Sequence, residues 1–211
     1  MDISNNSNSQ KRVRGAARTT REDWVAAGLE TLITEGVDSV KVAALAERLN
    51  CARSSFYWYF KDRSALLDAL LDHWQELNTH SIVSRAGRAA QTINLALVNV
   101  FECWTSDTIF DTRLDFAVRE WARRDEAVRR AVGISDDARL DALAGMFLRF
   151  GFEPGEAAVR ARVVYFTQIG YEALDTRRTR KDRAETGPHY LLCMTGQPPT
   201  ESELKALRAL L

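Results

Sequence analysis

Residues 53–61 concentrate side chains that can bind a polar surface. In order these are Arg53, Ser54, Ser55, Tyr57, Trp58, Tyr59 and Lys61. An arginine at the leading end of a helix can donate two hydrogen bonds to a guanine edge, and hydroxyl, indole and ammonium groups can donate to phosphate oxygens. A soluble protein seldom exposes so many aromatic rings on one short helix without a partner. The segment therefore indicates DNA binding. The alternative is that the three consecutive aromatic residues pack beneath a neighbouring domain.

The residues before this segment predict the element that positions it. Val42, Leu45, Ala46 and Leu49 recur at the spacing of one face of a short helix. Asn50 tolerates the left-handed conformation that ends helices, so a tight turn is expected at 50–52. A second short helix over 53–59 follows, with two phenylalanines, at 56 and 60, on its inner face. Two short helices joined by a tight turn form a helix-turn-helix, whose second helix enters the major groove N-terminus first.

Residues 24–67 resemble the DNA-binding domain of the tetracycline-repressor (TetR) family of bacterial transcription regulators. The similarity rests on LITEG (32–36), VKVAALAERLNCARSSFYWYF (40–60) and KDRSALL (61–67). The resemblance implies an all-α chain with a small three-helix DNA-binding domain. A long fourth helix would join this domain to a larger helical domain for ligand binding and dimerisation.

The resemblance also implies partners and further contact residues. The partners are a palindromic operator in double-stranded DNA, a second copy of the chain and a small-molecule effector. Thr20 and Arg21, at the start of the first helix, are candidates for a phosphate contact. At the start of the second helix the family commonly has Ser or Thr, but this chain has Lys41. Its ammonium could reach a phosphate, or Ser39 could cap the helix instead.

The charge balance follows the same division. The chain has 29 basic and 29 acidic residues, yet the stretch from Lys11 to Arg21 holds five positive residues and no acid. A positive field there suits phosphate neutralisation. We therefore expect a flexible basic arm over 1–17, a helix-turn-helix domain over 18–63 and a helical domain over 64–211. The arm is either a DNA contact or a solvated tail.

Beyond Asp62, a plausible N-cap, the pattern is helical to the end, which predicts about nine to ten helices in total. The long fourth helix is expected to reach about Ser84. Later helices are expected over 89–104, 112–123, 125–150 in two pieces near Gly133, and 154–175. A charged loop over 177–183 is expected to separate these from two short helices, one starting at Pro188 and one after Thr200.

Aromatic side chains in the second domain are candidates for lining an effector pocket. They are joined by one amide, and the full set is Trp104, Phe110, Phe116, Trp121, Phe147, Tyr165, Gln168 and Tyr171. Such a pocket would be largely apolar with a few polar groups. The alternative is that these rings are ordinary core. The small residues of helix 154–175 are similarly either the dimer interface, together with the 188–194 or C-terminal helix, or intramolecular core.

Composition narrows the function classes. The content of 45% hydrophobic and 27% charged residues is ordinary for a globular protein, and no apolar run approaches the roughly 20 residues of a membrane span. Three distant cysteines suggest a cytoplasmic protein with buried thiols. No phosphate-binding, zinc or nucleophile motif occurs, so we expect no metal, cofactor or enzymatic activity. The alternatives are an activator, a ligand-independent DNA binder, or an enzyme or carrier that retains a vestigial helix-turn-helix.

Overall fold

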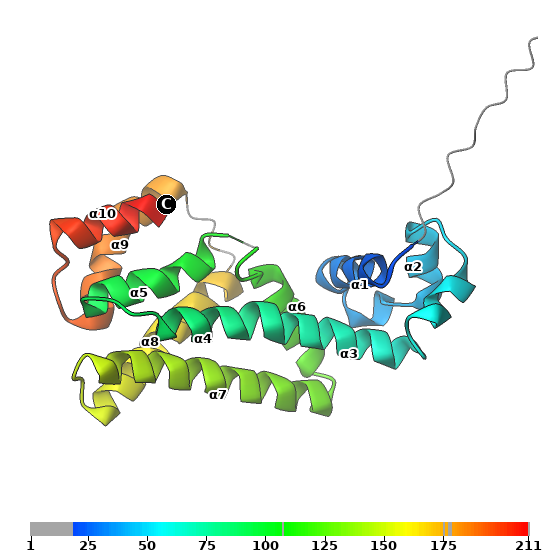
Figure 1. Cartoon of the computed structure of the whole chain (residues 1–211), viewed down its shortest axis with the longest axis horizontal. Coiled ribbons are helices and arrows are strands. Elements are labelled where there is room, and N and C mark those ends of the chain that lie inside the picture. The colour runs from blue at the N-terminus through cyan, green and yellow to red at the C-terminus, as the bar shows by residue number, and fades with distance from the viewer. Residues whose placement is uncertain (1–18, 107, 175, 177–178, 211) are drawn as a thin grey trace, which may run out of the picture.

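The computed structural model describes residues 19–106, 108–174, 176 and 179–210, and every regular element in these ranges is helical. They form ten α-helices, which confirms the predicted all-α class and helix number. The expected arm, residues 1–17, lies outside the described residues. One end of the molecule contains α1 (Arg21–Glu35), η1 (Val37–Ser39), α2 (Val42–Arg48) and η2 (Arg53–Trp58). At this end the chain forms a small bundle that projects from the larger helical body (Figure 1).

Local sequence signals explain α1 and its packing. Thr20 and Asp23 form a reciprocal capping box, so two free amides at the helix start are satisfied. The buried face of α1 consists of Trp24, Ala27, Gly28, Thr31 and Leu32. A Cβ at position 28 would lie 3.1 Å from Leu70 Cδ2, so glycine allows α1 and the following long helix to approach closely.

A continuous helical rod joins the two parts of the molecule. It consists of α3 (Arg63–Trp74), the π-helical turn η3 (Gln75–Thr79) and α4 (His80–Gly87), and we call it the connector. Asp62 caps the connector by accepting a hydrogen bond from the Ala65 amide, as the sequence predicts. Figure 1 shows the connector running from the N-terminal bundle into the larger body. The π-turn was not predicted, because one extra residue in a helical turn leaves no sequence pattern.

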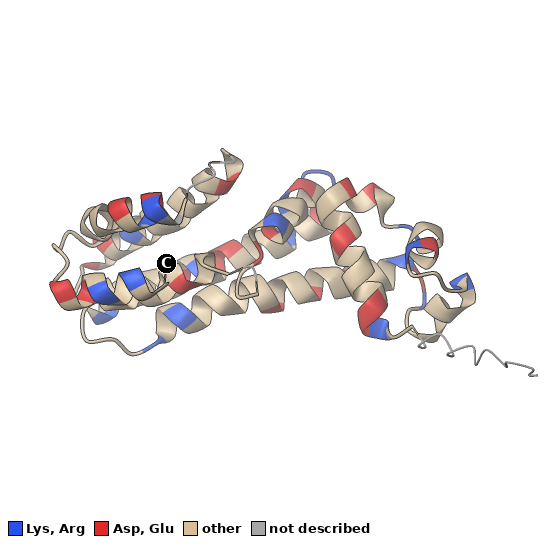
Figure 2. Cartoon of the chain, turned by 90° about the horizontal axis from the view of Figure 1, so that it is seen from above, with Lys and Arg blue, Asp and Glu red and all other residues tan. Residues whose placement is uncertain are grey.

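The larger body is built from the remaining helices. These are α5 (Ile93–Phe101), η4 (Glu102–Trp104), α6 (Thr112–Ala122), α7 (Glu126–Arg149), α8 (Pro154–Ala173), α9 (Arg180–Thr195) and α10 (Glu201–Leu210). In Figure 1, α7 lies alongside the connector. Figure 2 shows Lys and Arg interspersed with Asp and Glu over both parts of the molecule. Within the described ranges, no helix combines the length and apolar character needed to cross a membrane.

Two helix boundaries differ from prediction. Helix α7 is unbroken, because Gly133 sits on its exposed face while Val132 and Ser135 are buried; packing therefore outweighs the roughly 1 kcal/mol cost of a helical glycine. Helix α9 starts at Arg180 and contains Pro188 in its interior, so the predicted start at the proline was wrong. A capping box between Thr179 and Asp182 begins this helix, within the segment expected to be a loop.

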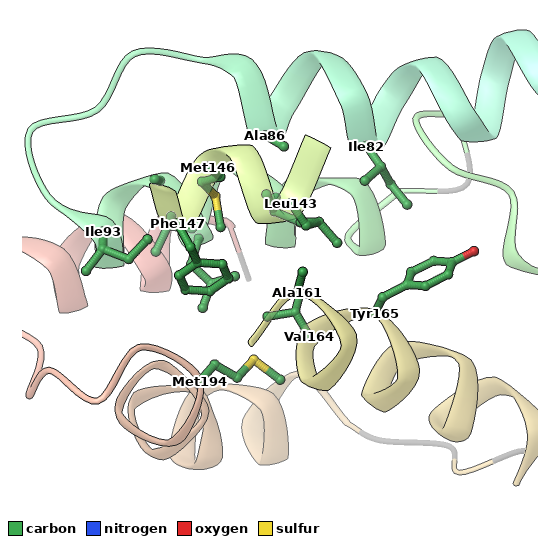
Figure 3. Packing of buried hydrophobic residues seen from close by; sticks show 14 of the residues in the cluster. Ile82, Ala86, Ile93, Leu143, Met146, Phe147, Ala161, Val164, Tyr165 and Met194 are labelled. Carbon is green, nitrogen blue, oxygen red and sulfur yellow. The ribbon is translucent and has the colours of Figure 1, made fainter. Parts of the chain in front are cut away.

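The apolar side chains form two cores that do not coincide with the predicted domain boundary at residues 63 and 64. The N-terminal core contains Trp24, Phe56 and Trp74, and it extends to Trp121 of α6 and Val132 of α7. The C-terminal core lies among α4, α5 and α7–α10 (Figure 3). Helix α7 and the connector therefore contribute to both cores and join the N-terminal end to the body.

Candidate nucleic-acid interface and cavity

The turn between α2 and η2 has the geometry that the sequence predicts. Asn50 has a φ of +48°, the left-handed conformation, and the Cys51 amide donates to the Ala46 carbonyl at 3.0 Å. The second helix, however, is a 3₁₀ helix over Arg53–Trp58 rather than an α-helix. Six residues are too few for an α-helical hydrogen-bond ladder to gain much over the tighter form.

The aromatic cluster of this segment divides into an inner and an outer layer. Phe56 and Phe60 are buried, with ring centroids 5.3 Å apart, and Phe56 meets Trp24 edge-on at 5.1 Å. Tyr57 and Trp58 are each 62% exposed on the opposite side. The alternative that these two rings pack beneath another part of the chain is therefore wrong within the described residues. An exposed aromatic pair on a buried aromatic base can contact an external partner.

The other residues of this segment that were predicted to bind DNA differ in their solvent exposure. Arg53, Ser54 and Lys61 are exposed. Ser55 is buried, and its hydroxyl donates to the Ala52 carbonyl at 2.7 Å, so the expectation that it faces outward was wrong. Tyr59 is half-buried, and its hydroxyl donates to the Thr19 carbonyl at 2.9 Å. Ser55 therefore stabilises the turn before the helix, and Tyr59 attaches the residue before α1 to this segment.

The start of α1 lies beside this segment. Tyr59 holds Thr19, and the Arg21 guanidinium lies 5.1 Å from the centre of the Phe60 ring. The Thr20 amide and the Thr20 hydroxyl both donate to the Asp23 carboxylate, and these two hydrogen bonds lower the pKa of Asp23. The predicted neighbours Thr20 and Arg21 are thus brought to the same end of the molecule as η2, at the N-terminus of α1.

The start of α2 is held by a residue that the sequence analysis missed. Lys41 is exposed at the N-cap and makes no side-chain cap, and Ser39 does not replace it, because its hydroxyl donates to the Glu35 carbonyl. Instead, Arg63 of the connector donates from Nε to the Val40 carbonyl at 2.5 Å and from Nη2 to the Val37 carbonyl at 2.6 Å. Arginine therefore clamps the entrance of α2 to the connector, a contact that local sequence does not reveal.

Replacing Arg63 with methionine is expected to lower the free energy of unfolding by about 1–2 kcal/mol, because two carbonyls lose a charged donor that is itself half-buried. Urea denaturation followed by circular dichroism measures the change. Arg48→Met is the matched control, since Arg48 makes only surface ion pairs with Glu30 and Glu35 and should change stability by less than about 1 kcal/mol. Equal effects of the two substitutions would refute the clamp.

A cavity of about 150 Å³ lies in the larger body, between η4, α8, α9 and α10. Three of the eight predicted pocket residues line it, namely Trp104, Gln168 and Tyr171. Tyr190, Arg183 and Leu207 complete walls that the sequence analysis did not assign, because they come from helices 80 to 100 residues away from η4.

The other five predicted pocket residues lie elsewhere. Phe110, Phe147 and Tyr165 belong to the C-terminal core, and Trp121 belongs to the N-terminal core. Phe116 is half-buried on α6 and does not line the cavity. For these five rings the alternative of ordinary packing describes the structure better, because periodicity identifies an apolar face but not the helix that covers it.

The cysteines are only partly as expected. Cys103 is buried, and burial raises the pKa of its thiol to about 12, so it stays protonated and unreactive at neutral pH. Cys51 is half-buried and Cys193 is exposed, so the expectation of three buried thiols was wrong.

A buried polar network at the centre of the molecule is the largest feature that the sequence analysis missed. Arg139 is fully buried and donates from Nη1 to Asp115 at 3.0 Å and to the Tyr165 hydroxyl at 2.8 Å. Arg119 donates to Asp115 at 2.8 Å and to Asp136 at 2.6 Å. Two arginines and two aspartates make the cluster neutral overall. Asp136 lies inside α7 and belongs to this network.

The N-terminal part of the chain is similar in sequence to known proteins. A family model described as "Bacterial regulatory proteins, tetR family" matches residues 25–70. Tetracycline repressor protein class G of Vibrio anguillarum is 50% identical over 46 residues, 22% of each chain. The class C repressor of Escherichia coli is 40% identical over 62 residues, 29% of this chain and 28% of that one. The matches thus span less than a third of these relatives' length.

Solved structures extend the similarity of fold to most of the chain. The fatty acid degradation regulator FadR of Bacillus halodurans has a TM-score of 0.62 at 14% identity, covering 87% of this chain and all of that one. GusR of Salmonella enterica has a TM-score of 0.57 at 13% identity, covering 90% and 92%. These likenesses concern the fold, and they show that the helical body is shared as well as the helix-turn-helix end.

Proposed function

The chain belongs to the tetR family of bacterial regulatory proteins, and from that premise we propose that it is a transcriptional repressor that a small molecule releases from a palindromic DNA operator. One observation carries the proposal. Tyr57 and Trp58 stand exposed beside Arg53, on the outer face of a helix-turn-helix whose inner face is sealed by Phe56. Exposed aromatic rings beside an arginine on the outer face of such a motif fit the groove and backbone of DNA.

The exposed residues take different roles in this proposal. We call η2 (Arg53–Trp58) the recognition segment. Its first residues, Arg53 and Ser54, contact base edges, and Arg53 donates to guanine. Phosphate oxygens are held by Tyr57, Trp58, Lys61 and Lys41, and by Thr20 and Arg21 at the start of α1. Ser55 and Tyr59 shape the segment from within. In this division residues 18–63 form the DNA-binding domain and 64–211 the ligand-binding and dimerisation domain, and the protein acts in the cytoplasm, where its operator lies.

A homodimer is part of the proposal, because one short recognition segment is too small for tight specific binding. The small-residue face of α8, which includes Ala157, Ala161 and Val164, is buried inside the protomer. The opposite face carries an exposed apolar row, Val159, Val163, Phe166 and Leu174, which we call the α8 stripe. An apolar row of this length on an outer helix favours a second copy as its cover. The stripe therefore replaces the small-residue face as the proposed interface.

The proposed effector binds the cavity among η4, α8, α9 and α10. Its walls combine aromatic rings, such as Trp104 and Tyr171, with the polar side chains of Gln168 and Arg183. A small, largely apolar molecule with a few polar groups fits that lining. Release from DNA requires that this molecule favour the conformation that does not bind the operator, typically by about 1–3 kcal/mol.

Fluorescence anisotropy tests the proposal with purified protein and an operator selected from random-sequence DNA, with scrambled DNA as the comparison. Tight, palindrome-dependent binding that weakens steeply with salt is expected, because phosphate contacts release counterions. Equal, weak binding to both DNAs would end the proposal. An activator or a ligand-independent binder gives the same result here, and a reporter gene placed downstream of the operator separates these from a repressor.

Arg53→Ala and Lys61→Ala are expected to weaken binding in different ways. Loss of Arg53 should cost about 1–3 kcal/mol on the operator and relax the preference at one base position. Loss of Lys61 should weaken binding to all DNA and reduce the dependence of log K on log salt by about one unit. Anisotropy titrations of both variants on operator and scrambled DNA measure these effects. Equal losses on both DNAs from Arg53→Ala would rule out base reading by that residue.

A further inference from the structure

The buried network around Arg139 joins three helices of the larger body, α6, α7 and α8. Arg139 and Asp136 come from α7, Asp115 and Arg119 from α6, and Tyr165 from α8. The Tyr165 hydroxyl donates to Asp136 at 2.6 Å and accepts from Arg119 at 2.7 Å. Figure 3 shows the Tyr165 ring extending from the apolar cluster with its hydroxyl pointing away from it. We call these five residues the Arg139 network.

The network grips the connector at its π-turn. Trp74 Nε1, in the last residue of α3, donates to Asp115 at 2.8 Å. One turn later the Asn78 side chain donates to the Asp111 carbonyl at 2.8 Å and accepts from the Asp111 amide at 3.2 Å. Arg139 Nε also donates to the Thr79 hydroxyl at 3.1 Å. These hydrogen bonds therefore join the π-turn, and the residue just before it, to α6 and α7.

Buried charges hold geometry more strictly than apolar contacts do. Arg139 is 0% and Asp115 2% exposed, so a displacement that separated them would leave charges without solvent. Apolar side chains in the same positions would constrain the direction of the connector less, because the hydrophobic effect is not directional. The connector, when such a network holds it, therefore has one preferred direction.

We propose that Arg139 is the positioning residue that sets the direction of the connector and thereby the distance between the two recognition segments of the dimer. The inference rests on the proposed function, since only a dimer on a palindrome has such a distance. Arg139 acts through Asp115 and Thr79 and touches no DNA. Because the recognition segment lies beyond the far end of α3, a small change of angle at the π-turn is amplified there.

The same network also borders the proposed effector cavity. Tyr165 lies between Val164 and Gln168 on α8, and both of these neighbours line the cavity. On the other side, Trp104 and Thr105 line the cavity at the start of the loop that ends at Asp111, the partner of Asn78. A molecule that displaces α8 or this loop acts directly on the contacts that hold the connector.

Half-site spacing gives a direct measurement. Inserting or removing one base pair at the centre of the operator changes the distance between the two half-sites by about 3.4 Å along the helix axis. Wild-type protein should strongly prefer the native spacing. Arg139→Met should lower the ratio of native to shifted affinity by about tenfold or more. This ratio is insensitive to the fraction of folded protein, so a general loss of stability does not change it.

Two further variants complete the experiment. Arg130→Met is the matched control, because Arg130 lies on the same helix, is exposed and pairs only with Glu126 at 3.5 Å; its ratio should equal that of the wild type. Tyr165→Phe removes one hydroxyl and keeps the ring, and it carries the test if Arg139→Met does not fold. A wild-type ratio in the folded variants, or wild-type binding that ignores spacing, overturns the proposal. A wild-type protein that binds no operator overturns the proposed function instead.

Discussion

Replacing Asp115 with alanine is expected to lower the free energy of unfolding by about 3–5 kcal/mol, because it leaves the buried Arg139 with only the more distant carboxylate of Asp136, 3.8 Å away. Trp74 Nε1 and one Asn78 amide hydrogen bond lose their acceptor at the same time. Urea denaturation followed by circular dichroism at neutral pH measures the loss. Asp137→Ala is the matched control, since Asp137 is exposed on α7 and should change stability by no more than about 0.5 kcal/mol.

The pH dependence of that loss distinguishes a charge effect from a packing effect. Burial alone would raise the pKa of Asp115, but the charges of Arg139 and Arg119 and the hydrogen bonds from Arg119 and Trp74 outweigh it and hold the pKa below the ordinary value of 3.8. The ionised carboxylate therefore stabilises the folded protein at pH values above that ordinary pKa. This stabilisation is lost as the pH falls through the lower pKa of the folded state. The difference in the free energy of unfolding between the wild type and Asp115→Asn should become smaller in strong acid. A difference that stays constant with pH would show that the charge contributes nothing.

Phe166→Asp is expected to dissociate the dimer and to reduce operator affinity by about a thousandfold, towards the level of non-specific binding. Phe166 is 56% exposed at the middle of the α8 stripe, where a carboxylate covered by a second copy would be buried without a partner. Analytical ultracentrifugation measures the oligomeric state, and anisotropy measures binding. The folded monomer should survive, because the side chain faces outward.

Ile134→Asp is the control for a general effect of removing an exposed apolar side chain. Ile134 is more exposed than Phe166 but lies on α7, away from the α8 stripe. It should leave both the dimer and operator affinity unchanged. A Phe166→Asp protein that remains dimeric would place the interface elsewhere on the molecule, whereas dissociation by Ile134→Asp would move it to α7.

The sequence by itself determined the features that depend on neighbours along the chain. Helical spacing identified Phe56 and Phe60 as the inner face of the second short helix, and the structure confirms that both are buried. Side-chain caps identified the starts of α1, α3 and α10 at Thr20, Asp62 and Thr200. Asn50 marked the turn between the two short helices. These signals act within about four residues, so tertiary packing had little opportunity to override them.

Only the tertiary structure decided what each apolar or polar face meets. Whether an aromatic ring of the second domain fills a core or lines the cavity depends on which helix covers it, and α9 and α10 begin 76 and 97 residues after η4 ends. Asp115 binds Trp74 and Arg139, which are 41 and 24 positions away, although each of the three alone resembles an ordinary helical residue. Such contacts leave no periodic trace, because helical periodicity shows which face is buried but not the partner it is buried against.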